Sequence, residues 1–349
     1  MKKIPWKKVF NLLFLVAVFG LTIWSVFNGV DLEQLVGYLK TAKLSYIFVG
    51  VFCVLLYVLG ESVIIYYLMR TLNTKVSFSH CCMFSFTGFF YSCITPGAGG
   101  GQPMQILAMR KDRIPVAVSS VVLAIVTLTF KMVLVLFGVL ILIIRPESMM
   151  VYLRPVEFWL YVGLGLNIIW IIGLLLLIFN PALVRKLAYG IFNILKKLHL
   201  IRNPERMPRR IENAVAQYQG TSDFFKTHKS VIFNVLVLTF VQRCILFFVT
   251  WLTYCSFGLN GADGASMPLV VSLQAMIAVA ADMLPLPGGM GACETLFMEI
   301  FQPIFGENLV LPGMVISRGV SYYTQLLICG IMTVVASFVI RDKKEKGRE

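Results

Sequence analysis

Charged side chains are scarce in this chain of 349 residues. Only 14% of its residues are Asp, Glu, Lys or Arg, whereas 58% are hydrophobic. The longest polar interval runs only from about 180 to 230, so no separate soluble domain is expected. Several apolar stretches reach the roughly 20 residues that an α-helix needs to cross a bilayer. The composition therefore predicts an all-α polytopic membrane protein that forms a single transmembrane domain over residues 1–349.

Signals for metal, cofactor and nucleic-acid binding are lacking as well. The eight cysteines fall in apolar or near-apolar segments without a C-x-x-C pair, and the three histidines are scattered without metal-ligand spacing. There is no Walker motif and no Ser/His/Asp arrangement. The net charge of +14 comes from basic residues that flank apolar segments, which is unlike a nucleic-acid-binding face. We therefore expect no metal, no cofactor, no catalytic residue and no nucleic-acid partner.

The apolar stretches predict six full transmembrane helices. Two further apolar segments, 78–110 and 268–305, are each interrupted by a break rich in Pro and Gly. These breaks, Pro96–Gly101 and Leu284–Gly291, cannot form good helices. Unpaired backbone groups cost several kcal/mol in hydrocarbon, so such breaks are expected only inside protein or beside a wet cavity. The six predicted spans are 9–27, 44–69, 116–144, 158–179, 231–257 and 313–340.

The order of these segments predicts inverted repeats. Each broken segment follows two spans and precedes one, which gives a first repeat over 9–144 and a second over 158–340. If each broken segment is a re-entrant hairpin that returns to the side it came from, the two repeats have opposite orientations, as in many transporters. The alternative is that one or both broken pairs cross the membrane fully, which would change the number of spans.

The distribution of basic residues predicts the orientation. Most of the 31 Lys and Arg residues lie on one side of this topology, at the termini, in two short loops and in the basic interval 180–230. Because cytoplasmic loops carry an excess of Lys and Arg, we expect a multi-pass plasma-membrane protein with both termini and this interval in the cytoplasm. The basic interval could also bind anionic lipid headgroups.

Ionisable residues inside spans are rare and usually face a bundle interior or an aqueous cavity, so they are candidate substrate-binding residues. Structural ion pairing is the alternative for each of them. The backbone N–H groups of the two breaks could attract an anion, and the alternative there is tight helix packing through glycine. The charged candidates are Glu61, Arg110, Lys131, Arg243, Asp282, Glu294 and Arg318, and those in the breaks are Pro96, Gly97, Gly99, Gly100, Gly101, Gln102, Gln105, Pro287, Gly288, Gly289 and Gly291.

The two break motifs, TPGAGGGQPMQ and LPLPGGMGACE, resemble the membrane region of the lysylphosphatidylglycerol synthase/flippase family. The resemblance extends over about residues 7–340. It implies movement of an aminoacylated phospholipid between leaflets, with roles for Glu61, Arg110, Glu294 and the glycines of both breaks. The full-length synthases also carry a soluble domain that takes the amino acid from aminoacyl-tRNA. This sequence shows no counterpart of that domain, so lysyl transfer is not expected of it.

These observations together predict a lipid transporter or flippase whose substrate headgroup enters a polar cavity between the two broken helices. The expected partners are membrane lipids, namely an anionic or aminoacylated phospholipid, and the candidate protein partners are a second copy of the chain or a lipid-synthesis enzyme. Two alternatives stay open at this stage. One is an intramembrane enzyme that transfers a group to or from a lipid phosphate, and the other is a non-transporting partner of a lipid-synthesis complex.

Overall fold

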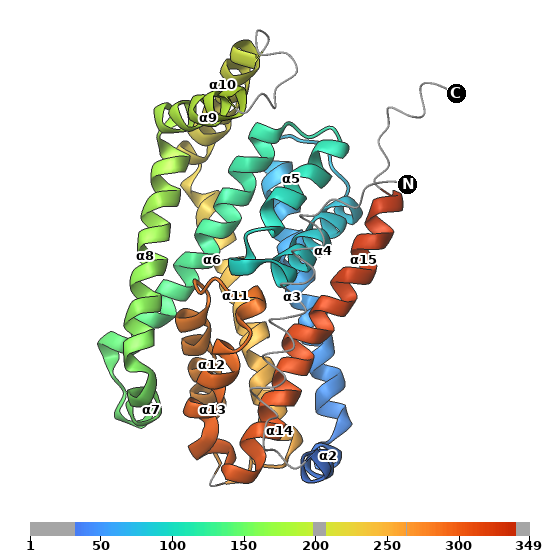
Figure 1. Cartoon of the computed structure of the whole chain (residues 1–349), viewed down its shortest axis with the longest axis vertical. Helices are drawn as coiled ribbons and strands as arrows, with labels where there is room; N and C mark the ends of the chain where they lie inside the picture. Colours follow the sequence, from blue (N-terminus) through green and yellow to red (C-terminus); the bar gives the residue numbers. More distant parts are fainter. Residues whose placement is uncertain (1–31, 198–206, 263, 340–349) are drawn as a thin grey trace.

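The computed structural model describes residues 32–197, 207–262 and 264–339, and every regular element in these ranges is a helix (Figure 1). The predicted first span, 9–27, and both chain termini lie outside the described residues. The prediction of an all-α polytopic membrane protein is confirmed.

Five helical segments of the described chain are long and apolar enough to cross a membrane. They correspond to the five remaining predicted spans. The fourth segment begins at Glu147, eleven residues before the predicted start at 158, because two short helices precede its long helix, and the other boundaries agree within a few residues except at the start of the last span. That span begins at Glu307, six residues before the predicted Gly313. The segments are α3 (Leu44–Thr71), α6 (Val116–Ile144), α7 (Glu147–Leu153) with η2 (Arg154–Val156) and α8 (Glu157–Phe179), α11 (Lys229–Ser256), and α14 (Glu307–Arg318) with η5 (Gly319–Thr324) and α15 (Gln325–Val339).

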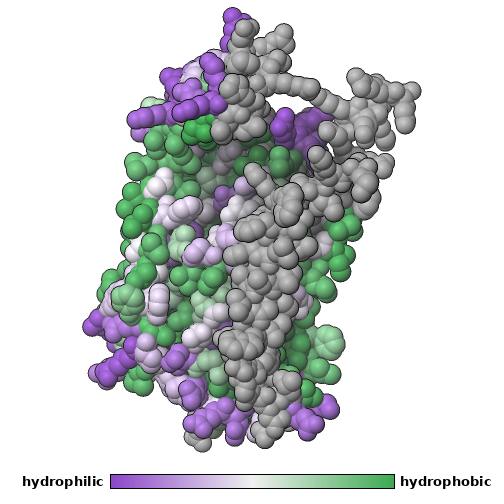
Figure 2. Space-filling view, in the orientation of Figure 1, coloured by the Kyte–Doolittle hydropathy of each residue, from purple (hydrophilic) through white to green (hydrophobic). Residues whose placement is uncertain are grey.

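Large hydrophobic side chains are exposed along these spans. On α8, for example, Ile169 is 66% exposed and Ile172 is 52% exposed. Figure 2 shows hydrophobic residues over the length of the molecule and hydrophilic residues gathered at its two ends. Contiguous apolar surface of this extent is unfavourable in water and is matched by lipid tails. The surface therefore agrees with a protein embedded in a bilayer.

The two broken segments form helical hairpins in opposite halves of the molecule (Figure 1). The first consists of α4 (Phe78–Ile94), the short helix η1 (Pro96–Ala98) and α5 (Gly101–Lys111). The second consists of α12 (Met267–Ala281), η4 (Pro287–Gly289) and α13 (Ala292–Phe305). Their tips, η1 and η4, contact each other. This arrangement supports re-entrant hairpins in inverted repeats, which stay a prediction.

The two breaks share the backbone conformation of two consecutive residues. Gly97 has φ 58° and ψ 26°, and Gly288 has φ 58° and ψ 18°. The next residues, Ala98 and Gly289, also have positive φ, at 55° and 66°. Left-handed conformations cost an L-residue about 1–2 kcal/mol, so glycine is the favoured residue here. Two segments about 190 residues apart in the chain thus make the same turn.

The basic interval forms two helices at one end of the molecule, α9 (Pro181–Lys197) and α10 (Met207–Thr227). In Figure 1, α9 lies across the end of α8. Two α10 side chains donate hydrogen bonds to the last carbonyls of α8, Tyr218 to Leu177 O at 3.2 Å and Ser222 to Ile178 O. Terminal carbonyls of a helix lack intrahelical donors, so α10 completes the end of this span.

Candidate functional site

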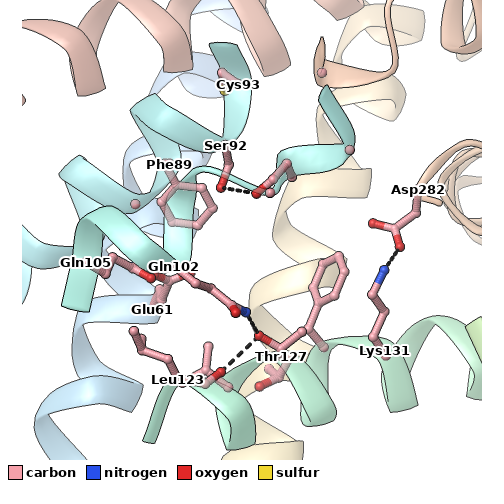
Figure 3. Close-up of a pocket in the computed structure, with 18 of the residues that line it drawn as sticks. Glu61, Phe89, Ser92, Cys93, Gln102, Gln105, Leu123, Thr127, Lys131 and Asp282 are labelled. Atoms are coloured by element: carbon pink, nitrogen blue, oxygen red, sulfur yellow. Dashed lines mark hydrogen bonds and ion pairs between the residues drawn. The ribbon is translucent and has the colours of Figure 1, made fainter. Parts of the chain in front are cut away.

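A cavity of about 440 Å³ lies where the two breaks meet (Figure 3). Its volume falls within the range of roughly 300–1,000 Å³ that is typical of small-molecule sites. Both halves of the chain contribute to its wall, which mixes polar, charged and aromatic side chains with glycine backbone. The lining residues come from α3, the whole first hairpin, α6, α8 and α11, together with the residues around the second break, η5 and the start of α15.

The first break forms one wall of the cavity and is held by hydroxyl groups. Thr95 Oγ1 accepts a hydrogen bond from Gly100 N at 2.8 Å and donates one to Tyr91 O at 2.6 Å. Gly101 sits against α4, where an added Cβ would lie 2.7 Å from Gly88 O. The tight-packing alternative therefore describes Gly101. Gly97 and Gly99, by contrast, line the cavity.

Two glutamines of α5 extend this polar wall. Gln105 is buried, and its Nε2 donates to Glu61 Oε1 on α3 at 2.6 Å. Gln102, about one turn earlier, donates to the Thr127 hydroxyl of α6 (Figure 3). Among the described residues, Glu61 has no basic partner within 4.0 Å. Its carboxylate therefore faces the cavity with only an amide donor attached.

An ion pair joins the two halves of the chain across the cavity. Lys131 of α6 donates to Asp282, which directly follows α12, and also to Met283 Sδ at 3.1 Å (Figure 3). Lys131 is buried, so its charge requires a partner. Both residues line the cavity, but their charges already neutralise each other.

Arg243 of α11 supplies a positive charge without an ion pair in the described part of the chain. Its guanidinium Cζ lies 3.5 Å from the ring centre of Phe130 and 5.1 Å from that of Tyr57. Arg243 Nε is buried and has no hydrogen-bond partner. A buried donor left unpaired costs about 1–3 kcal/mol. Arg243 Nε is therefore a donor without a partner in the described part of the chain, and a role in binding an anionic acceptor stays a prediction.

Glu294 and Arg318 form a separate buried cluster behind the second break. Arg318 Nε donates to Glu294 Oε1 at 2.7 Å, and Arg318 Nη2 donates to Gly288 O at 3.0 Å. The other carboxylate oxygen of Glu294 accepts from Gly291 N at 2.7 Å, which caps α13. Neither side chain lines the cavity. Structural pairing, the alternative raised by the sequence, describes this cluster.

The structure therefore divides the predicted site residues into three groups. One group lines the cavity, a second belongs to the breaks or to the ion pair behind the second break without lining the cavity, and Arg110 lies exposed at the end of α5, outside the cavity wall. Their roles in substrate binding stay predictions. The first group is Glu61, Gly97, Gly99, Gln102, Gln105, Lys131, Arg243, Asp282 and Gly288, and the second is Pro96, Gly100, Gly101, Pro287, Gly289, Gly291, Glu294 and Arg318.

Several lining residues were not predicted. Gln242 donates from Nε2 to Tyr57 O at 2.7 Å, and Gln325 lies at the start of α15. Both side chains are polar amides within apolar spans, and this feature of the sequence could have identified them as candidate lining residues. The aromatic residues Tyr57, Phe130 and Trp170 carry no such signal, because aromatic side chains are common in membrane helices.

Trp170 connects the cavity with the outer surface. It lines the cavity from the middle of α8 and is 50% exposed. Its neighbour Ile169 is 66% exposed on the same span. A side chain that belongs both to the cavity wall and to the apolar surface marks a lateral opening. This position of Trp170 is consistent with a cavity that opens toward the side of the helical bundle.

Fold and site together define a polytopic α-helical membrane protein with a central polar cavity between two broken helical hairpins. The chain belongs to the family described as the lysylphosphatidylglycerol synthase TM region, whose sequence model matches residues 12–329. The resemblance expected from the two break motifs is thus confirmed, and the match concerns the membrane region of that family. No curated protein sequence matches the chain. Family membership indicates a lipid-related function in the membrane.

Proposed function

We propose that this protein moves a phospholipid between the two leaflets by passing its headgroup through the central cavity while its acyl chains stay in the membrane. The observation that carries this proposal is the position of Trp170, which borders both the polar cavity and the apolar surface. A molecule with a polar head and apolar tails can occupy both environments at once. A purely soluble substrate would not require a cavity wall that is shared with the apolar surface.

The charged side chains of the cavity that have no ion pair within 4.0 Å in the described part of the chain suggest which groups the headgroup carries. Lys131 is neutralised by Asp282, and Arg318 by Glu294. Arg243 keeps an unpaired donor, and Arg is well suited to phosphate recognition. Glu61, which has no ion pair within 4.0 Å in the described part of the chain, can accept a hydrogen bond from an ammonium group. We therefore assign the lipid phosphate to Arg243 and the amine of an aminoacylated headgroup to Glu61.

The proposal places the two hairpins as re-entrant elements of inverted repeats, one reaching the cavity from each side of the membrane. It also places both termini and the basic interval in the cytoplasm of a plasma-membrane protein. The two-residue turn that both breaks share and the contact between η1 and η4 support this assignment. Without an ATP-binding motif, the energy would come from an ion gradient or from the lipid gradient itself.

Transbilayer movement of fluorescent lipids in proteoliposomes tests the proposal. The assay compares fluorescent phosphatidylglycerol with a lysylated analogue and follows loss of fluorescence when a membrane-impermeant reductant is added. Hydrogen bonds to charged groups contribute about 1.5–3 kcal/mol, so we expect Arg243→Gln to slow the movement of both lipids by roughly 10- to 100-fold. Glu61→Gln should slow the lysylated lipid more than phosphatidylglycerol.

Lys111→Gln is the matched control, because it removes one positive charge at an exposed position of α5 away from the cavity. If wild-type protein moves neither lipid, the transport proposal is wrong. Mass spectrometry of the recovered lipids then distinguishes the alternatives. A chemically altered lipid would indicate an intramembrane enzyme, and an unaltered one would indicate a partner of a lipid-synthesis complex.

A further inference from the structure

The helix α9 carries an apolar stripe that nothing in the described part of the chain covers. Leu187 is 48% exposed, Ile191 is 58% exposed and Ile194 is 61% exposed. Their spacing of four and three residues places them on one face of the helix. Exposed aliphatic residues are common singly, but three in a row on one helix form a contact surface.

Another side of α9 is fixed to α10, so the stripe has a defined direction. Arg185 Nη2 lies 3.0 Å from Glu212 Oε2, and Tyr189 donates to Glu212 Oε1 at 3.0 Å. Phe192 is buried. Because these three α9 residues lie away from the face of Ile191, α10 anchors the helix while the stripe points outward.

The charge of α9 is entirely positive. Its sequence PALVRKLAYGIFNILKK contains four basic residues and no Asp or Glu. Lys186 and Lys197 are exposed, and at about 100° per residue they lie along one edge of the stripe. A helix with an apolar face bordered by Lys is typical of elements that lie in the plane of a membrane interface.

The position of α9 agrees with that environment. Exposed apolar side chains continue along α8 through Leu176, which is 53% exposed, to Phe179, its last residue, which is 36% exposed. The helix α9 begins two residues later, at Pro181, and crosses the end of α8 (Figure 1). The stripe is thus continuous in the chain with a surface that faces lipid.

We propose that α9 is an interfacial helix that binds anionic phospholipids, with Leu187, Ile191 and Ile194 inserted among the upper acyl chains and Lys186 and Lys197 contacting phosphates. The charge distinguishes this occupant from a second copy of the chain. Two α9 helices in a symmetric contact would bring their positive charges together, whereas an anionic surface attracts them. This inference does not depend on the proposed transport activity.

The environment of the stripe can be measured in the intact protein. A fluorescent noncanonical amino acid at Ile191 reports depth, with Asn193, an exposed polar residue of the same helix, as the matched position. In vesicles of phosphatidylcholine with phosphatidylglycerol, we expect bromine on lipid acyl chains to quench the probe at Ile191 and aqueous iodide to quench the probe at Asn193. A probe at Leu187 should behave like the one at Ile191.

The lysines are tested by the dependence of this quenching on lipid charge. Each basic residue near an anionic surface strengthens binding by about five-fold at low salt. We therefore expect Lys186→Gln with Lys197→Gln to abolish the gain in acyl-chain quenching between vesicles without and with phosphatidylglycerol. Lys111→Gln with Lys229→Gln removes the same charge from exposed positions outside α9 and should leave the gain unchanged.

Two results would overturn the proposal. Iodide quenching at both Ile191 and Leu187 in anionic vesicles would show that the stripe faces water. Protection from iodide in lipid-free detergent that increases with protein concentration would show that a second copy covers the stripe instead.

Discussion

The two breaks share the turn at Gly97–Ala98 and Gly288–Gly289 but are held by different interactions. In the second break, the buried ion pair of Glu294 and Arg318 fixes both the turn and the start of α13. In the first, the Thr95 hydroxyl bridges Tyr91 and Gly100, and no ion pair is present among the described residues of the hairpin tip. The same backbone turn is therefore stabilised by an ion pair in one break and by neutral hydrogen bonds in the other.

This difference separates the two breaks by function. A buried ion pair strongly resists removal of one partner, which makes the second break a rigid support. Neutral hydrogen bonds are worth about 0.5–1.5 kcal/mol each, so the first break is held less tightly. It also contributes more residues to the cavity, including Gly97, Gly99 and Gln102. We infer that the first break responds to the headgroup while the second keeps the cavity in place.

The largest expected difference concerns Glu294, which is buried, and Glu61, which lines the cavity. Glu294→Gln leaves Arg318 without a countercharge in a buried site, so it should lower the free energy of unfolding by about 3–5 kcal/mol. Glu61→Gln keeps a hydrogen-bond acceptor for Gln105 and breaks no ion pair within 4.0 Å among the described residues. It should therefore lower the free energy of unfolding by less than about 1 kcal/mol. Thermal unfolding in detergent measures both. Equal losses of stability would remove the distinction between a supporting and a binding glutamate.

A smaller difference is expected for glycine substitutions at equivalent positions of the breaks. Gly97→Ala and Gly288→Ala both place Ala at φ 58°, which costs about 1–2 kcal/mol. A Cβ at Gly288 would also overlap the Tyr322 ring, whereas at Gly97 the nearest atom is 3.9 Å away. Overpacking adds about 1–3 kcal/mol, so Gly288→Ala should be more destabilising by that amount.

The comparison of these two variants uses the same unfolding assay. Tyr322→Leu provides the control, because removing the ring should relieve part of the cost at Gly288 and leave the cost at Gly97 unchanged. If Gly97→Ala is the more harmful variant, the first break is the tightly packed one and the division proposed above is wrong.

The sequence predicted the elements of the cavity better than the connections between them. Pro and Gly in apolar segments reveal the two breaks directly, because their backbone limits are local. The ion pair of Lys131 with Asp282 joins residues 151 positions apart, so its formation depends on how the helices pack. For the same reason, sequence alone could not show that Arg318 is neutralised while Arg243 is not.

The last span shows a second limit. Its start at Glu307 and the π-helix over Gly319–Thr324 both escaped the apolar pattern. A π-helix adds one residue to a helical turn, so the side chains after it lie on a different face of the helix. The apolar pattern of the sequence does not reveal where this occurs. Here the π-helix places Tyr322 where its hydroxyl donates to Cys93 O at 3.0 Å, which links the last span to the end of α4.

The smallest effect on stability is expected at Gly99. This residue has φ −67° and ψ −18°, which any L-residue adopts, and the nearest atom to an added Cβ is Pro96 O at 3.5 Å. Gly99→Ala should therefore change the free energy of unfolding by less than about 1 kcal/mol, and a slight stabilisation is consistent with the reduced freedom of the unfolded chain.

Because Gly99 lines the cavity, the larger Gly99→Leu should slow lipid movement strongly at nearly unchanged stability. Gly165→Leu is the matched control for side-chain size. Gly165 lies on α8 outside the cavity, and no atom lies within 4 Å of a Cβ added there. If Gly99→Leu moves lipid as fast as this control, the headgroup does not pass the first break.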